Sequence, residues 1–328
     1  MARIGNPTTS ASRGQRYRDA ELRLWHYYGL DPKERFLDLE APAARLRVLE
    51  VGSGEPILFV HGTAGPGSWP SLIAQLPDFR SIVLDRPGWG ASTPIDFSRD
   101  AYGPLVADIL RGALDALELD RANVIGASIG DVWVLRLAER HPTRVGRIVL
   151  LGGGPVVAEV GVPRIIRLLA TPLGAVMVRR PDQPNRVRSI LRQLGHGPSL
   201  DAGRIPDEFI DWRVTVAHES DSMRHEREMI RAIVRGRSYR PGLTFDDDSL
   251  AAIQLPTVHL FGTADPTGSA DIWQRVADVL PRGELRLIEA AGHMPWFDDP
   301  AQIAGTVRRF LTTGSAPAGG FVATTDSP

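Results

Sequence analysis

The chain has 328 residues, no cysteine and a formal net charge of −1 at neutral pH. The lack of cysteine excludes disulfides, thiolate metal sites and a cysteine nucleophile, and Lys33 as the sole lysine disfavours lysine-assisted catalysis. The balanced charge gives no indication of binding to nucleic acid or to a membrane surface.

The two ends of the chain are rich in small and polar residues. We therefore predict disordered tails at residues 1–15 and 314–328. The N-terminal segment lacks the apolar stretch of a signal peptide. No apolar run approaches the roughly 20 residues that span a bilayer. We expect a protein of the cytoplasm.

The elements between the tails alternate between strand and helix patterns. Helical patterns cover residues 18–28, 70–76, 105–117 and 132–140, with further helices after the last two strands. Strands are predicted at residues 35–39, 46–51, 57–60, 82–84, 124–125, 148–151, 257–261 and 284–288. Short apolar strands that alternate with helices predict an α/β fold, whose mostly parallel sheet of about eight strands has helices on both faces.

Residues 155–250 break this alternation. The segment is poor in strands and shows helical patterns at residues 165–169, 187–194, 209–217 and 226–235. It follows a predicted strand through the flexible Gly152-Gly153-Gly154-Pro155. We interpret it as a helical cap inserted between a first core part, residues 16–154, and a second, residues 251–313.

The pentapeptide Gly126-Ala127-Ser128-Ile129-Gly130 lies between a predicted strand and a predicted helix. A serine on such a tight strand–turn–helix connection has its hydroxyl raised above the sheet, which requires small residues two positions before and after it. The same turn aims the backbone N–H of Ile129 at the place where an oxyanion would form. The pattern alone is weak, because an ordinary glycine-flanked serine loop has the same sequence.

Four further segments, each directly after a predicted strand, strengthen the interpretation. They are His61-Gly62-Thr63-Ala64, the segment 85–92 (Asp-Arg-Pro-Gly-Trp-Gly-Ala-Ser), Gly262-Thr263-Ala264-Asp265 and Ala291-Gly292-His293-Met294-Pro295-Trp296. With the pentapeptide they make residues 30–312 resemble the α/β-hydrolase family, in its capped form with a serine nucleophile and the order nucleophile, acid, histidine.

The resemblance implies a catalytic triad. Ser128 would be the nucleophile, His293 the base that takes its proton, and Asp265 the acid that orients the imidazole. The simpler alternatives are a packed loop histidine at His293 and a turn-forming aspartate at Asp265. Asp298 and Asp299 also lie near His293 in sequence, and we expect both to begin the last helix instead.

The resemblance also implies an oxyanion hole. Its donors would be the backbone N–H groups of Ile129 and Thr63. His61 is expected to shape the turn rather than to transfer protons, and Asp85 and Arg86 are expected to have scaffold roles.

Asp131 departs from the family pattern, which usually has a small residue after the second glycine of the elbow. One interpretation is an acid in the first turn of a helix, stabilised by the helix dipole. The other is a negative charge near the nucleophile, which would raise the pKa of His293 and oppose an oxyanion.

Several chemistries of the family fit poorly. Ser128 replaces the aspartate nucleophile of haloalkane dehalogenases and epoxide hydrolases, Ala127 replaces the asparagine usual in carbon–carbon bond hydrolases, and Thr63-Ala64 departs from the turn of proline iminopeptidases. We therefore predict hydrolysis of a carboxylic ester or lactone of a small molecule through an acyl-enzyme, without cofactor or metal. A carbon–carbon bond hydrolase, a lyase or cyclase, and a ligand receptor remain alternatives. The sequence does not predict an oligomeric state.

The substrate-binding residues are expected beside the triad and in the cap. We name Trp296, Ala64, Ala127 and Trp212 as candidates. Weaker candidates are Trp69, for which core packing is at least as plausible, and Arg213, His218 and Arg224 of the cap.

Overall fold

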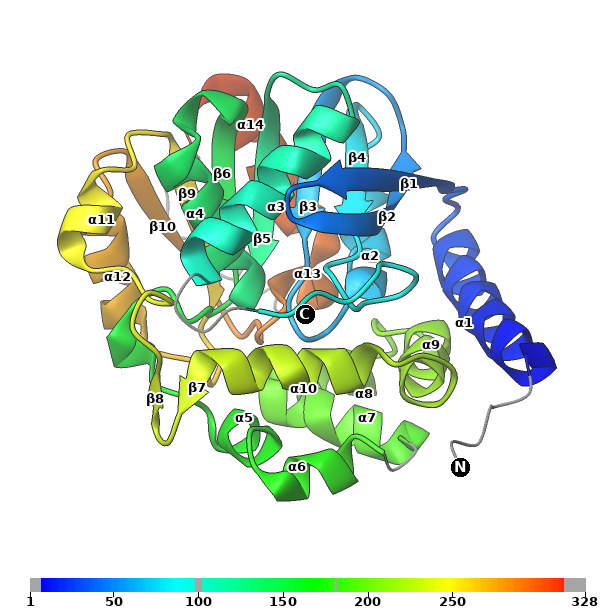
Figure 1. Cartoon of the computed structure of the whole chain (residues 1–328). Helices are drawn as coiled ribbons and strands as arrows, with labels where there is room; N and C mark the ends of the chain where they lie inside the picture. Colours follow the sequence, from blue (N-terminus) through cyan, green and yellow to red (C-terminus); the bar gives the residue numbers. More distant parts are fainter. Residues whose placement is uncertain (1–6, 98–101, 180–181, 316–328) are drawn as a thin grey trace, which may run out of the picture.

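The computed structural model describes residues 7–97, 102–179 and 182–315. All eight predicted strands are present within it, and they form one sheet (Figure 1). In chain order these strands are β1 (Lys33–Glu40), β2 (Ala43–Val51), β3 (Glu55–Val60), β4 (Phe79–Leu84), β5 (Ala122–Ala127), β6 (Val145–Leu151), β9 (Thr257–Gly262) and β10 (Gly283–Ile288).

The strand order across the sheet is β1-β2-β4-β3-β5-β6-β9-β10. The pairings of β2 with β1 and with β4 are antiparallel, and every pairing from β4 across to β10 is parallel. The chain runs outward from β3 to β4 and then returns to β5 on the other side of β3. In open α/β sheets ligands bind beyond the carboxyl ends of the strands at such a reversal. The prediction of a mostly parallel α/β sheet is confirmed.

Helices cover both faces of the sheet, and each face has its own apolar core. One core packs under α3 (Tyr102–Ala116), α4 (Ile129–Arg140) and α12 (Ala270–Val279). The other packs under α1 (Pro7–Tyr27), α2 (Pro70–Ile73), α13 (Pro295–Asp298) and α14 (Pro300–Thr313). All six residues of β5 and of β9 are buried, as expected for central strands that are covered on both faces.

Residues 155–250, which we call the cap, lie between β6 and β9, and most of their described helices sit beyond one end of the sheet (Figure 1). These helices are α5 (Arg164–Leu169), α6 (Pro172–Met177), α7 (Pro184–Leu191), α8 (Gly197–Asp201), α9 (Asp207–Glu219) and α10 (Ser222–Ile233). Helix α11 (Asp247–Ala251), where the chain returns to the core, packs beside α12. A short hairpin of β7 (Val234–Arg235) and β8 (Ser238–Tyr239) follows α10. Short helical turns lie at Pro66–Ser68, Pro142–Arg144, Ala158–Val160 and Arg192–His196.

The helix boundaries differ from the predicted ones at several places. Helix α1 begins at Pro7, so residues 7–15 belong to a helix and not to a disordered tail. Helix α2 ends at Ile73, and α10 ends at Ile233, where the hairpin begins. Of the predicted C-terminal tail, residues 316–328 lie outside the described part of the chain.

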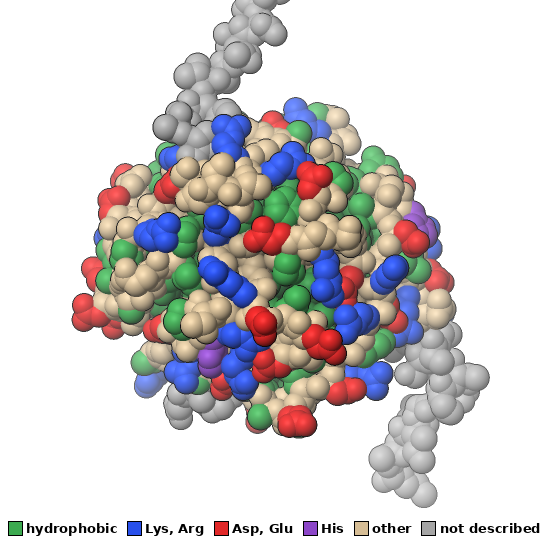
Figure 2. Space-filling view, turned by 90° about the horizontal axis from the view of Figure 1, so that it is seen from above, with side chains coloured by type: hydrophobic (Ala, Val, Ile, Leu, Met, Phe, Trp, Pro, Cys, Tyr) green, Lys and Arg blue, Asp and Glu red, His purple; other side chains and the backbone are tan. Residues whose placement is uncertain are grey.

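The surface on the side opposite the cap mixes charges of both signs. Basic and acidic side chains alternate there with apolar ones, and neither sign forms a continuous patch (Figure 2). No helix of the described residues has the length and apolar character that crossing a membrane requires.

Candidate active site

Ser128 lies on the turn between β5 and α4, with φ 56° and ψ −122°. A positive φ is strained for a residue with a side chain, and such strain is characteristic of functional turns. A Cβ atom on Gly126 would lie 2.7 Å from the carbonyl oxygen of Gly130, and one on Gly130 would overlap the carbonyl oxygen of Val60. The structure therefore shows why both flanking positions must be glycine.

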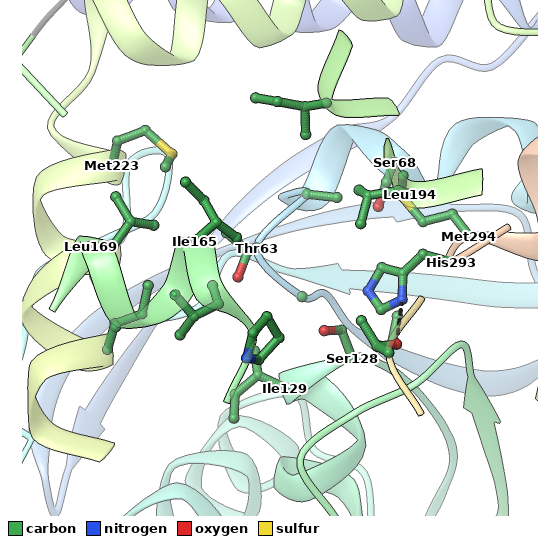
Figure 3. A pocket seen from close by; sticks show the side chains of 18 of the residues that line it. Thr63, Ser68, Ser128, Ile129, Ile165, Leu169, Leu194, Met223, His293 and Met294 are labelled. Carbon is green, nitrogen blue, oxygen red and sulfur yellow. Dashed lines mark hydrogen bonds between the residues drawn. The ribbon is translucent and has the colours of Figure 1, made fainter. Parts of the chain in front are cut away.

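His293 follows β10 and contacts the acid that follows β9. Its Nδ1 lies 2.9 Å from Oδ2 of Asp265 and 3.1 Å from Oγ1 of Thr267. This arrangement leaves Nε2 as the ring nitrogen that faces the cavity beside Ser128 (Figure 3). Ser128 forms no hydrogen bond to His293 here, and in serine enzymes without substrate this bond is often long or poorly aligned.

Asp265 is buried, and its carboxylate takes part in four hydrogen bonds. Its carboxylate accepts hydrogen bonds from the backbone N–H groups of Gly153 and Thr267, from the Thr267 hydroxyl and from His293. Burial alone would raise the pKa of this carboxyl, but the charge of His293 and the hydrogen bonds from His293 and Thr267 outweigh it and hold the pKa below its ordinary value. Asp265 is therefore a fixed negative charge behind the imidazole, and it forms the expected turn with Thr267 as well.

The predicted oxyanion donors lie on either side of Ser128. Thr63 and Ile129 both line the same cavity as Ser128 and His293. A Cβ atom on Gly62 would lie 2.8 Å from the Cβ of Ser128, so only glycine lets the turn after β3 approach the serine this closely. Ile129 is the first residue of α4, where the backbone N–H has no partner within the helix.

His61 is buried beneath this turn and does not line the cavity. Its Nε2 accepts a hydrogen bond from the backbone N–H of Arg86, and its Nδ1 lies 2.7 Å from the carbonyl oxygen of Gly62. Burial and the neighbouring Arg86 charge hold the pKa of His61 well below its ordinary value. Asp85, directly after β4, accepts a hydrogen bond from the guanidinium of Arg47. These contacts agree with structural roles for all three residues.

Asp131 is fully buried in the first turn of α4, and neither carboxylate oxygen accepts a well-formed hydrogen bond from the described residues. Its Oδ2 would lie 2.9 Å from a Cβ atom on Gly154, so the carboxyl faces the glycine segment after β6. Burial raises its pKa well above the ordinary value, and the negative charge of Asp265 acts in the same direction. The buried site therefore disfavours the ionised form of this carboxyl. Its predicted place in the first helical turn is confirmed, and the raised pKa counts against both interpretations, because each relies on a negative charge.

The cavity above Ser128 has a volume of about 280 Å³. Most of the residues around it are apolar, and most of these come from the cap (Figure 3). They include Val160, Ile165, Ile166, Leu169, Met177, Val178, Val187, Ile190, Leu191, Leu194, Phe209, Met223, Met229, Ile230 and Ile233. Among the described residues, Asp182, Arg186 and Arg213 are the Asp, Glu, Lys or Arg side chains that line it. The cavity suits a substrate whose larger part is hydrophobic.

Three of the four predicted substrate-binding residues line this cavity: Ala64, Ala127 and Trp296. Trp212 does not, and this prediction is wrong. Its indole is completely buried, packs against Phe209, and lies so close to Gly65 and Gly67 that a side chain there would clash with it. It fills the junction between α9 and the turn after β3.

Of the weaker substrate-binding candidates, one lines the cavity and the others do not. Trp69 is buried and stacks on Trp296 with ring centroids 4.8 Å apart, outside the cavity. Arg213 lines the cavity, where its nearest hydrogen-bond partners are the sulfur of Met223 and, at 3.5 Å, the carbonyl oxygen of Thr63. His218 and Arg224 do not line it.

The two acids after His293 have different positions. Asp299 caps α14 by accepting a hydrogen bond from the backbone N–H of Gln302, as predicted. Asp298 does not begin that helix, and this prediction is wrong. Its carboxylate instead accepts hydrogen bonds from His196, Ser199 and the backbone N–H of Gly292, so it joins the cap to the loop of His293.

Three residues that contact the site were missed in the sequence: Thr267, Glu226 and His196. Thr267 stands two residues after Asp265 in Asp-Pro-Thr, a position at which a turn hydroxyl could have been expected. Nothing in the local sequence marks Glu226 or His196. Among the described residues no cluster of three or more histidine, aspartate or glutamate side chains could hold a metal ion.

Comparisons with known proteins identify hydrolases that are similar to this chain. The model of the "Alpha/beta hydrolase family" matches residues 57–306. A 2-hydroxy-6-oxononadienedioate/2-hydroxy-6-oxononatrienedioate hydrolase of Pseudomonas putida is 28% identical over 92% of this chain and 96% of that protein. A 2-hydroxymuconate semialdehyde hydrolase of Pseudomonas sp. is 27% identical over 86% of this chain and 95% of its own length.

The similar solved structures include a carboxylesterase and a dienoate hydrolase. Carboxylesterase CesB from Bacillus subtilis has a TM-score of 0.73 and 19% identity, and covers 93% of this chain and 99% of its own. The 2-hydroxy-6-oxo-6-phenylhexa-2,4-dienoate hydrolase from Rhodococcus sp. has a TM-score of 0.71 and 17% identity, and covers 86% of this chain and 99% of its own. With the family model matched over most of its length, this chain belongs to the alpha/beta hydrolase family.

Proposed function

We propose that this hydrolase cleaves a carboxylic ester or lactone of a small, predominantly hydrophobic molecule through an acyl-enzyme. The observation that carries the proposal is the convergence at one cavity of Ser128, the His293–Asp265 pair and the turn of Thr63. A nucleophile, a base and backbone donors beneath an apolar cavity are the groups that acyl transfer requires.

In the first half of the reaction, the Ser128 hydroxyl attacks the carbonyl carbon while Nε2 of His293 takes the proton. The backbone N–H groups of Thr63 and Ile129 hold the oxygen of the tetrahedral intermediate, a contribution typically worth roughly 100- to 1000-fold in turnover for each donor. Asp265 stabilises the imidazolium that forms, because its carboxylate already accepts the Nδ1 proton. The imidazolium then protonates the leaving alcohol.

In the second half, water replaces the alcohol. His293 takes a proton from the water as it attacks the acyl carbon, and returns that proton to Ser128 when the acid leaves. For a lactone the alcohol stays attached to the acyl group, and the product is a hydroxy acid. Both halves of the reaction use the same triad and the same oxyanion-hole N–H groups, so the proposed mechanism needs no further catalytic residue.

The cavity lining supports a hydrophobic acyl or alcohol group. Burial of each additional methylene contributes about 0.8 kcal/mol. The volume of about 280 Å³ accommodates several methylene groups beyond the ester itself. We therefore expect medium-length acyl esters to be better substrates than acetyl esters.

A carbon–carbon bond hydrolase is the second candidate function. Two observations favour it. Curated relatives named for dienedioate and semialdehyde substrates align over most of this chain, and Arg213 is a cavity cation to which no carboxylate of the described residues is hydrogen-bonded. A guanidinium in an apolar cavity would pair with a substrate carboxylate. Ala127 counts against this candidate, because the asparagine usual in such enzymes is missing.

A comparison of kcat/KM values across substrate classes separates the two candidate functions. We would measure kcat/KM for p-nitrophenyl esters from acetyl to decanoyl, for a set of lactones, and for a 2-hydroxy-6-oxohexa-2,4-dienoate with an apolar 6-substituent. The proposal expects ester or lactone turnover that Ser128→Ala abolishes and that exceeds dienoate turnover at least tenfold. Faster turnover of the dienoate would replace the proposal by the second candidate.

A further inference from the structure

The carboxylate of Glu226, on cap helix α10, is buried and accepts three hydrogen bonds from the core. The Thr63 hydroxyl donates to Oε1 at 2.9 Å. The Arg86 guanidinium donates to Oε2 at 2.8 Å, and the Trp89 indole donates to the same oxygen at 2.7 Å. Thr63 follows β3, whereas Arg86 and Trp89 follow β4, so one cap side chain joins two turns at the edge of the sheet that carries Ser128.

The same network fixes the peptide unit between Gly62 and Thr63. Nη2 of Arg86, which donates to Glu226, also lies 3.2 Å from the carbonyl oxygen of Gly62. Glu226 therefore restrains this unit twice, through the Thr63 side chain and through Arg86, and it adds to the contacts that the Gly62 oxygen makes with Nδ1 of His61 at 2.7 Å and with the Gly65 N–H at 3.1 Å. In a trans peptide the N–H points away from the C=O. Because the carbonyl oxygen of Gly62 is held toward Arg86, the N–H of Thr63 points in the opposite direction.

The position of that N–H matters for the reaction. Thr63 lines the cavity with Ser128, and its N–H has no acceptor within the described part of the chain. A donor that is already fixed in place stabilises developing charge without reorganisation, and small displacements of such a group reduce turnover strongly.

We propose that Glu226 is a positioning residue of the oxyanion hole: it holds the Gly62–Thr63 peptide so that the Thr63 N–H points at the reacting oxygen. The inference rests on the proposed serine hydrolysis. It assigns to the cap a part in the chemical step, in addition to the lining of the substrate cavity. The carboxylate itself does not touch the reacting atoms.

The network predicts a specific pattern of variants. Thr63→Val keeps the shape and the backbone N–H but removes the hydroxyl, so turnover should fall roughly 10- to 100-fold with KM little changed. Thr63→Ser restores a hydroxyl and should recover most of that loss. Glu226→Gln should lower kcat similarly, and combining it with Thr63→Val should add little, because the two changes act on one interaction.

Glu219→Gln is the matched control. Glu219 is also a cap carboxylate that binds an arginine of the core, with Arg16 of α1 at 2.8 Å, but this pair lies at the surface and away from Ser128. Its turnover should equal that of the parent protein.

The deciding measurement is the second-order rate at which a fluorophosphonate probe labels Ser128, followed by intact mass in variants whose folding is verified by circular dichroism. This rate depends on the serine and the oxyanion hole, not on the choice of ester. The inference predicts slow labelling of Thr63→Val and Glu226→Gln, recovery in Thr63→Ser, and the parent rate in Glu219→Gln.

Labelling of Thr63→Val at the parent rate would overturn the inference, and this variant decides the question even where Glu226→Gln does not fold. A folded parent protein that the probe does not label would instead overturn the proposed function on which the inference rests. The two failures are therefore distinguishable.

Discussion

His196 of the cap accepts a hydrogen bond at Nε2 from the backbone N–H of Met294, the residue directly after His293. Its Nδ1 lies 3.0 Å from the Asp298 carboxylate. The backbone N–H of His293 itself donates to the carbonyl oxygen of Leu194 at 2.8 Å. The cap segment that ends at His196 thus holds the loop that carries the proposed catalytic histidine.

His196→Ala should reduce both activity and stability. It removes the acceptor of the Met294 N–H and a partner of Asp298, and leaving buried polar groups unpaired costs roughly 1–3 kcal/mol each. We expect a lower unfolding temperature and a kcat reduced about tenfold, since the position of His293 becomes less defined. His141→Ala, at a partly exposed histidine paired with Asp108, is the control. A parent-like kcat in a folded His196→Ala protein would show that this contact does not position His293.

Asp131→Asn should stabilise the protein increasingly as the pH rises. The pKa of Asp131 is raised in the folded state, so the group is neutral in both states below about pH 4, the ordinary range of an aspartate. At higher pH the unfolded chain releases the proton and the folded protein keeps it. Stability is therefore lost as the pH rises, by at most about 1.4 kcal/mol per pH unit.

The asparagine variant lacks this ionisable group. Urea unfolding of parent and variant at pH 5 and pH 8 measures the difference directly. We expect the advantage of Asp131→Asn over the parent to be larger at pH 8. An advantage that is equal at both values, or larger at pH 5, would mean that Asp131 is ionised in the folded protein.

Asp265→Asn should abolish most of the activity while the fold persists. The asparagine cannot supply the negative charge behind His293, and it can favour the wrong imidazole tautomer, an effect of about 10,000-fold in serine proteases. Thr267→Val removes one hydrogen bond to Asp265 and one contact with His293, so a smaller loss of about tenfold is expected. Steady-state kcat on the preferred ester tests both. Equal losses in the two variants would contradict the assignment of the main electrostatic role to Asp265 and of a supporting hydrogen bond to Thr267.

Leu169→Trp should shorten the range of accepted acyl chains. Leu169 lies on α5 and lines the cavity. A larger side chain removes space that a long acyl group would fill, and one methylene in such a pocket changes kcat/KM by roughly 10- to 200-fold. The ratio of kcat/KM for decanoyl to butanoyl esters should fall at least tenfold. An unchanged ratio would place the acyl chain elsewhere.

The sequence predicts the parts of the site that depend on local chain geometry. The turn of Ser128 is recognisable because its glycines follow a fixed spacing: Gly126 is required by the backbone of Gly130 and Asp131, and Gly130 by the backbone of Val60 on the neighbouring strand. His293 and Asp265 are found because each follows a predicted strand, and the carboxyl ends of parallel strands share one edge of the sheet.

The contacts of the cap could not be predicted in the same way. Thr63 and Glu226 are 163 residues apart, and His196 and Met294 are 98 apart, so no local pattern connects them. Trp212 shows the converse error: an aromatic residue on a cap helix is equally suited to a substrate cavity and to a packed junction, and only the tertiary structure distinguishes the two. The burial of Asp131, which raises its pKa, could not be predicted, because a position in a first helical turn does not reveal burial.

The most direct test of the central claim is the intact mass of the protein after treatment with a fluorophosphonate probe, beside a Ser128→Ala control. We expect one adduct in the parent protein and none in the variant, because only an activated serine with an accessible oxyanion hole reacts. A folded parent protein without an adduct, or a variant that is labelled as readily as the parent, would contradict the claim.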